Sequence, residues 1–260
     1  MDSLKIASQK SPCYPCRMCG RFTLKGPPNQ IAQMLGLATV PNLAPRYNIA
    51  PTQDVLALRP EADGNRHLAW LRWGLIPFWA KDMAVGAKMI NARADTLAEK
   101  PAFRQAFRAR RCVIAADGFY EWKTVAKGRK QPYHIHRADG APFVFAGLWE
   151  RWEKGAEPVE SCTIVTTEAP ADLAAIHHRV PVILEGAALQ AWLDTPAGET
   201  DGLLELLAPL AEGTLVADPV ATTVNKVAND GPACLEPAAE EAAAPEAPAP
   251  AKAPQDDLFG

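Results

Sequence analysis

The sequence predicts an α+β fold built on a largely antiparallel, strongly curved sheet. The predicted strands follow one another in hairpin-like succession, and they do not alternate strictly with helices as a parallel sheet would require. The 260 residues are 48% hydrophobic and 22% charged, which is ordinary for a globular protein. No apolar run reaches the length of a membrane span, so we expect no membrane partner.

Periodicity and turn signals place the expected elements in chain order. Apolar and polar side chains alternate along residues 67–73, whereas Phe103 and Phe107 share one face of a helix that has Pro101 in its first turn. The expected helices are 31–37, 101–111, 170–176, 186–193 and 202–207, and the expected strands are 55–58, 67–73, 113–116, 133–137, 143–147 and 162–167.

The chain divides into three zones. Residues 1–17 are short, polar and without periodicity, and residues 18–231 hold all the apolar runs. Residues 232–260 contain 10 Ala and 6 Pro in 29 positions, so they bury too little apolar surface to offset the entropy of ordering. We expect one folded domain over 18–231, followed by a disordered Ala, Pro and Glu-rich tail.

Charge is distributed unevenly between the two halves of that domain. Residues 18–137 carry 19 Lys and Arg against 8 Asp and Glu, whereas residues 138–231 carry 4 Lys and Arg against 15 Asp and Glu. The positive and negative halves cancel, so the formal net charge of −3 does not reveal either of them. Such asymmetry is a hint of polyanion binding. The alternative is that the halves interleave in one fold and their charges mix on its surface.

Cys19 is the most distinctive chemical group. The 6 Cys are too few for a disulfide scaffold and indicate a reducing cytoplasm. If Met18 were the initiator and were removed, Cys19 would carry a free α-amine beside its thiol. The amine captures an aldehyde as a Schiff base and the thiolate then closes a thiazolidine ring. The alternative role is that of a buried structural cysteine.

Three further polar groups occur in apolar surroundings. Asn91 either caps a following helix or holds a substrate oxygen through its amide. Glu121 lies between aromatic residues, where burial would raise its pKa and make it a usable acid or base; otherwise it is an exposed strand residue. His177 ends an expected helix, where it either compensates the helix dipole or moves protons.

Residues 73–79 are rich in aromatic side chains. We expect Trp73 in the core and Trp79 at the surface. Together with Arg93 this segment suits single-stranded nucleic acid, because rings stack on bases and guanidinium groups bind phosphates. The alternative is that these rings pack in the core.

These segments together resemble the SOS response-associated peptidase (SRAP) family, in the family's order and across the whole of 18–231. The family fold is α+β, with a twisted, barrel-like sheet and surrounding helices. The matching stretches are 18–22, 46–51, 73–79, 90–93, 117–122, 166–167, 176–181 and 224–227 with Asn229.

The resemblance implies a DNA-damage function: sensing abasic sites in single-stranded DNA and crosslinking to them through an N-terminal cysteine, after self-processing of any preceding residues. Cys19 would supply the amine and thiol, Glu121 would orient the amine and assist proton transfer, His177 would act as acid and base, and Asn91 would position the linkage. The residues implied to bind DNA are Arg21, Asn48, Pro51, Trp79, Arg93, Thr166 and Arg179, with Arg93 and Arg179 on phosphates.

Two departures from the family pattern matter. Residues 1–17 precede Met18, and an acylated nitrogen cannot form a Schiff base, so we expect either a misassigned start or a cleaved leader. His178 follows His177 where the family commonly has an acidic residue, which alters the surroundings of His177.

The remaining expectations concern partners and rival functions. Gln255, Leu258 and Phe259 resemble the short motif by which bacterial proteins dock on the replication sliding clamp. Cys13, Cys16 and Cys19 have a spacing that can ligate zinc or an iron–sulfur cluster, but a fourth ligand is missing, so we expect no metal and no cofactor.

We expect a monomer in the cytoplasm, associated with the nucleoid. The rival functions are a cysteine-dependent amidase or peptidase and a non-catalytic module that binds single-stranded DNA.

Overall fold

The computed structural model describes residues 19–61 and 64–239. The strands are β1 (Phe22–Leu24), β2 (Arg46–Ile49), β3 (Asp54–Pro60), β4 (Arg66–Trp73), β5 (Asn91–Arg93), β6 (Arg111–Ala116), β7 (Gly118–Thr124), β8 (Lys130–Arg137), β9 (Phe143–Trp152), β10 (Val159–Glu168), β11 (Arg179–Pro181), β12 (Ile183–Leu184) and β13 (Leu215–Pro219). The α-helices are α1 (Pro28–Leu35), α2 (Arg104–Ala109), α3 (Ala171–Ala174) and α4 (Gly186–Asp194), and the 3-10 helices are η1 (Met83–Lys88), η2 (Ala94–Thr96), η3 (Ala126–Gly128), η4 (Glu205–Leu207), η5 (Thr222–Asn225) and η6 (Pro232–Leu235).

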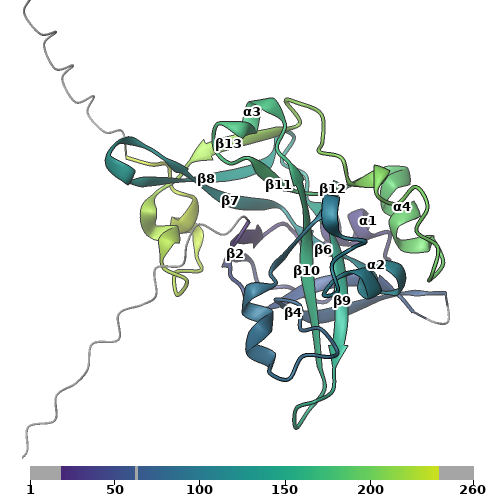
Figure 1. The fold of residues 1–260 in the computed structure, drawn as a ribbon. Helices are drawn as coiled ribbons and strands as arrows, with labels where there is room; N and C mark the ends of the chain where they lie inside the picture. Colours follow the sequence, from purple (N-terminus) through teal and green to yellow (C-terminus); the bar gives the residue numbers. More distant parts are fainter. Residues whose placement is uncertain (1–18, 62–63, 240–260) are drawn as a thin grey trace, which may run out of the picture.

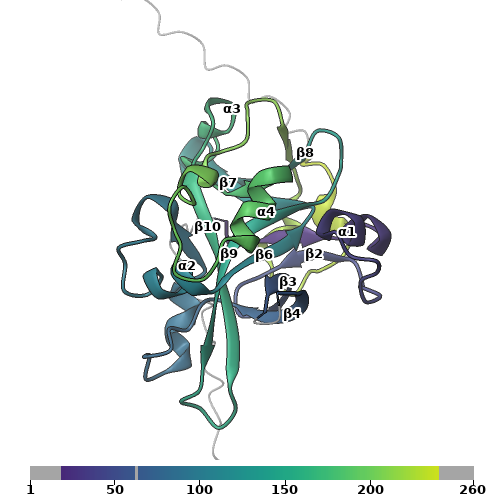
Figure 2. The same cartoon turned by 90° about the vertical axis from the view of Figure 1, so that its right-hand side faces the viewer.

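Five strands close into a barrel. Strand β10 pairs with β4, β4 with β3, β3 with β6, β6 with β9, and β9 returns to β10. Only the β4–β10 pairing within this ring is parallel. Figure 1 shows β9 and β10 running through the centre of the molecule, and in Figure 2, turned by 90°, α4 lies over the barrel. The predicted α+β class with a largely antiparallel, barrel-like sheet is therefore confirmed.

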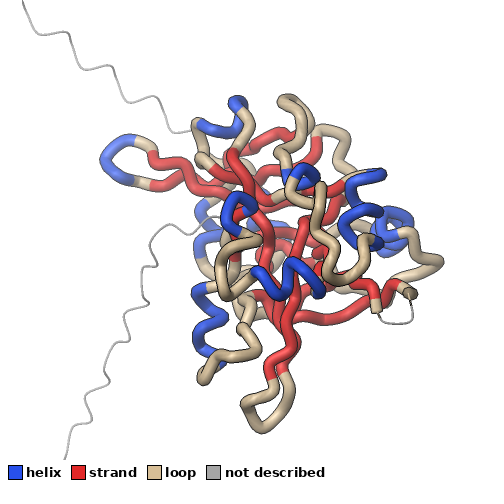
Figure 3. The backbone as a smooth tube through the Cα atoms, turned by 45° about the vertical axis from the view of Figure 1, so that its right-hand side comes forward, coloured by secondary structure: helices blue, strands red, loops and turns tan. Residues whose placement is uncertain are grey.

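A second sheet lies beside the barrel, in the order β13–β8–β7–β1–β2. Asp117 alone separates β6 of the barrel from β7 of this sheet, so the chain runs almost without interruption from one sheet into the other. The tube view in Figure 3 shows the strands of both sheets surrounded by short helices and loops. This arrangement carries the start of β1 to the boundary between the two sheets.

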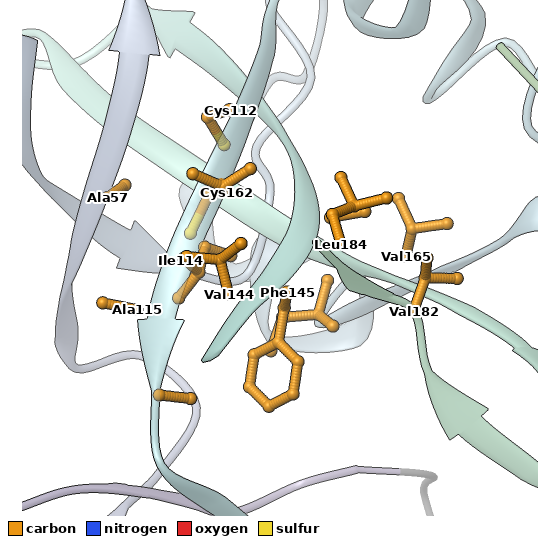
Figure 4. Packing of buried hydrophobic residues seen from close by; sticks show 14 of the residues in the cluster. Ala57, Cys112, Ile114, Ala115, Val144, Phe145, Cys162, Val165, Val182 and Leu184 are labelled. Atoms are coloured by element: carbon orange, nitrogen blue, oxygen red, sulfur yellow. The ribbon is translucent and has the colours of Figure 1, made fainter. Parts of the chain in front are cut away.

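The core fills the barrel and continues under the second sheet. Figure 4 shows side chains from β3, β6, β9, β10 and β12 gathered in one cluster, among them Cys112, Phe145 and Cys162. Trp73 is fully buried and Trp79 is 44% exposed, as the sequence predicts. Burial of the apolar strand faces supplies most of the driving force for this fold.

Several elements differ from the sequence-based expectation. The helix expected over 101–111 spans only Arg104–Ala109, because Arg111 already pairs with Leu148 in the barrel. Of the helix expected over 202–207, only the 3-10 turn Glu205–Leu207 forms, and α3 covers only Ala171–Ala174 of 170–176. In each case the periodic segment is too short for local propensity to outweigh tertiary contacts.

The ordered region extends past residue 231, so the predicted start of a disordered tail at 232 is wrong for residues 232–239. Residues 232–235 form η6, Cys234 is buried, and Pro237 makes a β-bridge with Val220. A small apolar cluster with Tyr120 offsets the cost of ordering this segment. The expected leader (1–17) and the clamp motif at Gln255, Leu258 and Phe259 lie outside the described residues.

Candidate active site

Cys19 lies three residues before the start of β1 and is fully buried. Its backbone N–H donates a hydrogen bond of 2.7 Å to Oε1 of Glu121, which lies on β7. Its φ of 32° falls in the left-handed region, which side-chain-bearing residues rarely adopt. Burial, and secondly the nearby Glu121, raises the pKa of the thiol well above its usual range, so the sulfur is held as a thiol in this arrangement.

Glu121 is buried in a largely apolar setting on β7. Burial raises the pKa of this carboxyl to about 8, and hydrogen bonds from the backbone N–H groups of Cys19 and Trp122 and the charge of Lys130 oppose the shift. The expectation that burial raises its pKa is confirmed, and the alternative of an exposed strand residue is wrong. A carboxyl group with such a pKa can give and take protons near neutral pH.

Asn91 approaches Cys19 from a different element. Its Nδ2 donates to the backbone carbonyl of Cys19 at 3.4 Å. The alternative of an N-cap role is wrong, because Asn91 begins strand β5, which pairs in parallel with β10, and the 3-10 helix η2 starts only at Ala94. Three segments that are far apart in sequence therefore meet at Cys19: the start of β1, β5 and β7.

His177 is half-buried in the loop between α3 and β11, so it does not end a helix as predicted. Its Nδ1 accepts the backbone N–H of Arg179 at 3.2 Å, and its ring stacks on that of His178 with centroids 4.4 Å apart. Burial chiefly lowers the pKa of His177, and the charges of His178 and Lys130 add to this effect. Between these described residues, no hydrogen bond joins His177 to Cys19 or Glu121.

Strands β5, β10 and β11 bring three of the predicted DNA-binding residues together. Thr166 of β10 pairs with Arg93 of β5 on one side and with Pro181 of β11 on the other. Strand β11 begins with Arg179. The guanidinium of the buried Arg179 donates from Nη2 to the carbonyl oxygen of Thr166 at 2.6 Å. Among the residues that the structure describes, its buried Nε has no hydrogen-bond partner. Arg93 is exposed and forms a two-pronged ion pair with Asp95, through Nε at 3.0 Å and through Nη2.

Arg21 and Asn48 have a different environment from the one their predicted role implies. The Asn48 side chain is buried and lies within 3.1 Å of the carbonyl oxygens of Val224, Lys226 and Asn229. Arg21 donates to Oδ1 of Asn48 at 2.9 Å and to the Val224 carbonyl at 2.7 Å. Both side chains hold the segment 220–239, which we call the C-terminal strap.

Sequence reasoning missed one residue that fixes this strap. Asp230 accepts the backbone N–H groups of Tyr47 at 2.6 Å and Asn48 at 2.8 Å, and pairs with the guanidinium of Arg46. The only signal was its place directly after Asn229 in the last matching stretch. The strap therefore joins β2 to the end of the described chain.

The aromatic segment exposes Trp79, as the sequence predicts, and also Phe78. Phe78 is 52% and Trp79 44% exposed, and Pro51 is half-buried in the turn between β2 and β3. Two hydrogen bonds from side chains at the end of β9 and just after it hold this loop in place. Trp152 Nε1 donates to the Ala80 carbonyl at 2.8 Å, and Lys154 Nζ donates to the Trp79 carbonyl at 2.9 Å. Exposed rings on a fixed loop form a surface on which bases can stack.

The described residues contain no group of three or more His, Cys, Asp or Glu that could hold a metal ion. No helix within the same part of the chain has the length and apolar character needed to cross a membrane.

Residues 18–227 match the family described as SOS response associated peptidase (SRAP). The chain belongs to the SRAP family. Abasic site processing protein YoqW of Bacillus subtilis is 41% identical over 223 residues, which cover 84% of this chain and 99% of that protein. Abasic site processing protein HMCES of Gallus gallus is 37% identical over 225 residues, covering 74% of this chain and 66% of that protein.

Solved structures share the SRAP fold. A protein from Bacteroides thetaiotaomicron superposes with a TM-score of 0.74 at 26% identity, covering 85% of this chain and all of that one. A phage-related protein from Bordetella bronchiseptica gives a TM-score of 0.64 at 34% identity, covering 78% of this chain and 94% of that one. The barrel and second sheet described above are thus those of SRAP proteins.

Proposed function

We propose that this protein processes abasic sites in single-stranded DNA and captures them through Cys19 as a covalent thiazolidine. The observation that carries the proposal is the 2.7 Å hydrogen bond between the Cys19 nitrogen and the Glu121 carboxylate in a buried site. A carboxyl group with a pKa of about 8 beside that nitrogen is suited to exchange protons with an amine. The relatives named for abasic site processing support the same substrate.

The capture reaction needs no oxidant and no cofactor. The free Cys19 amine attacks C1′ of the ring-opened sugar, and the carbinolamine loses water to give an imine. The sulfur then adds to the imine carbon, its proton passes to the nitrogen, and the five-membered ring closes. Glu121 takes a proton from the attacking amine, His177 acts as acid and base on the departing oxygen, and Asn91 holds the backbone of Cys19.

Exposure of the amine requires cleavage before Cys19 whenever residues precede it. In that hydrolysis water adds to the carbonyl carbon of residue 18, the C–N bond breaks, and the nitrogen of Cys19 takes up a proton. A protonated Glu121 hydrogen-bonded to this nitrogen is placed to supply it. The left-handed backbone of Cys19 supports the same role, because cleavage removes the strained peptide link.

The DNA strand binds across β5, β10 and β11 and over the aromatic loop. Arg93 and Arg179 bind phosphates beside Thr166, and Phe78 and Trp79 stack on bases next to Pro51. We assign Arg21 and Asn48 an indirect part in this interface, since their polar atoms hold the C-terminal strap.

The test uses protein that begins at Cys19 and an oligonucleotide with one abasic site. We expect a denaturation-resistant shift that is lost in Cys19→Ala and retained in Cys162→Ala, which removes a buried thiol in the barrel. Absence of the shift with the unmodified protein would rule out capture. Hydrolysis of added peptides would instead favour the amidase, although Cys19 lacks a hydrogen bond to His177 within the described residues.

The proposed partner at the C-terminus is tested separately. Deletion of residues 255–260, which removes Gln255, Leu258 and Phe259, should abolish binding to the replication sliding clamp in a pull-down and leave capture of DNA intact. Clamp binding by the shortened protein would contradict the motif.

A further inference from the structure

The outer part of the β7–β8 hairpin is basic along its whole length. Residues 122–131, which we call the basic arm, contain four Lys and Arg and no Asp or Glu. Arg129 and Lys130 are exposed and Lys123 is half-buried. The arm is therefore a local concentration of positive charge in a protein whose formal net charge is −3.

The arm extends beyond the sheet that supports its base. Strand β1 pairs with β7 only at Gly118 and Phe119, and β13 pairs with β8 no farther out than Tyr133. Beyond these positions the strand ladder consists of β7 against β8 alone, as at Lys123 with Gln131. The C-terminal strap holds only the inner end of the arm, where Trp122 Nε1 donates to Asn225 Oδ1 and Gln131 Nε2 to the Val220 carbonyl, each at 2.8 Å. Figures 1 and 3 show this two-stranded ribbon projecting from the body of the molecule, with η3 at its tip.

The base of the arm is the candidate active site. Glu121 lies on β7 two residues before Lys123. Lys130, near the tip, is close enough for its charge to act on both Glu121 and His177, which approach from different elements. The positive ribbon therefore borders the site in which Cys19 and Glu121 meet.

We propose that the basic arm binds the sugar–phosphate backbone of the DNA strand on one side of the captured nucleotide. This inference rests on the proposed function, since it extends the same substrate outward from the site. A projecting two-stranded ribbon presents its lysines to a flexible strand without burying apolar surface, and neutralising phosphates releases counterions. The contrasting explanation is that lysines on unpaired strand edges only prevent edge-to-edge association.

The decisive variant replaces Lys123, Arg129 and Lys130 together by Gln. The matched control replaces Lys100, Arg104 and Arg108 by Gln, which removes the same charge from exposed positions. Two of them lie in α2, on the far side of the barrel from the arm in Figure 1, and Lys100 precedes this helix. Binding is measured by fluorescence anisotropy on undamaged single-stranded DNA, so that altered chemistry at Glu121 or His177 does not enter. Thermal unfolding of both variants verifies that they fold.

We expect the slope of log affinity against log salt to fall by about 0.7 for each phosphate that the arm variant no longer neutralises, and to stay unchanged in the control. In a second series, both variants carry Cys19→Ala so that no capture occurs, and the oligonucleotides contain one abasic site and are shortened from either end. The difference in slope should vanish once the nucleotides on one side of the lesion are removed. Equal slopes in the two variants would overturn the proposal. The proposal would also fail if the arm variant bound DNA normally but self-associated in light scattering. The lysines would then only prevent association of exposed strand edges.

Capture by the unmodified protein at low salt separates this inference from the proposed function. If capture occurs and the arm variant binds normally, only the arm proposal fails. If capture fails but the arm variant still has a smaller slope of log affinity against log salt than the unmodified protein, the arm proposal stands and the crosslinking chemistry is wrong.

Discussion

The guanidinium of Arg21 and the side-chain amide of Asn48 are hydrogen-bonded to each other at 2.9 Å, and both also bind the carbonyl oxygen of Val224. Two residues that the family resemblance places on DNA therefore meet on the protein's own C-terminal strap. This pair connects β1 and β2 to residues more than 170 positions later in the chain.

Replacing Asn48 by Ala should destabilise the protein by about 1–3 kcal/mol, because it removes a donor to the carbonyl oxygens of Lys226 and Asn229 and leaves the Val224 carbonyl with Arg21 alone. Urea unfolding measures the decrease. Asn29→Ala, at an exposed position of α1, is the control and should stay within about 0.5 kcal/mol of the unmodified protein. An Asn48→Ala protein of normal stability that binds DNA poorly would instead support a direct contact with the strand.

The stability contributed by Glu121 should depend on pH. Its pKa is about 8 in the folded protein against 4.5 when unperturbed, so between these values the folded state binds a proton that the unfolded state lacks. Stability is then full below about pH 4.5 and falls, by up to about 1.4 kcal/mol per pH unit, as pH rises toward 8. Glu121→Gln removes this dependence, whereas Glu99→Gln, at an exposed site, retains it. Parallel unfolding curves for the unmodified protein and Glu121→Gln from pH 5 to 8 would contradict the assignment.

The same substitution should slow capture of an abasic site by about a hundredfold or more, because Gln cannot exchange a proton with the Cys19 amine. Single-turnover assays on protein that begins at Cys19 measure the rate. The affinity for undamaged single-stranded DNA serves as the control and should not change. An unaltered rate would remove Glu121 from the chemistry.

Gly86 fixes the aromatic loop through close backbone packing. A Cβ at this position would lie 2.5 Å from the carbonyl oxygen of Gly74 and 2.9 Å from Cγ1 of Ile76. We expect Gly86→Ala to cost about 1–3 kcal/mol and to weaken binding of single-stranded DNA, since the loop that carries Trp79 must shift. Gly231→Ala adds a methyl group into open space on extended backbone, with φ −145°, and should be neutral. Equal effects of the two substitutions on DNA binding would show that the loop tolerates displacement.

Trp152 holds the same loop through one hydrogen bond, from its Nε1 to the carbonyl oxygen of Ala80. Trp152→Phe keeps most of the buried ring but removes the donor, and we expect weaker binding of single-stranded DNA with altered fluorescence of Trp79. Trp192→Phe is a matched control, because this buried indole donates to the Cys112 carbonyl at 3.0 Å inside the core. Both variants should be destabilised to a similar extent. Weaker DNA affinity in both would point to a general effect of destabilisation.

Most of the long strands and the buried Trp73 could be predicted from sequence, because alternation over many residues averages out local exceptions. The seven-residue strand β7 was missed. The short strands β1, β5, β11 and β12 could not, since two or three residues carry no period. The exposure of Trp79 was predictable from its Gly- and Pro-bounded segment. The fixing of that segment by Trp152 and Lys154 was not, because these side chains come from a part of the chain more than 70 residues later.

The sequence by itself determined the fold class, the family and the candidate groups Cys19, Asn91, Glu121 and His177, because these depend on residue type, order and spacing. Only the tertiary structure decided which of these groups meet, and with what charge. Glu121 acquires a pKa of about 8 through burial against the start of β1, and Asn48 binds the strap through hydrogen bonds to a segment near the other end of the chain. Desolvation and long-range hydrogen bonds arise only when distant segments pack together, and no local pattern in the sequence encodes them.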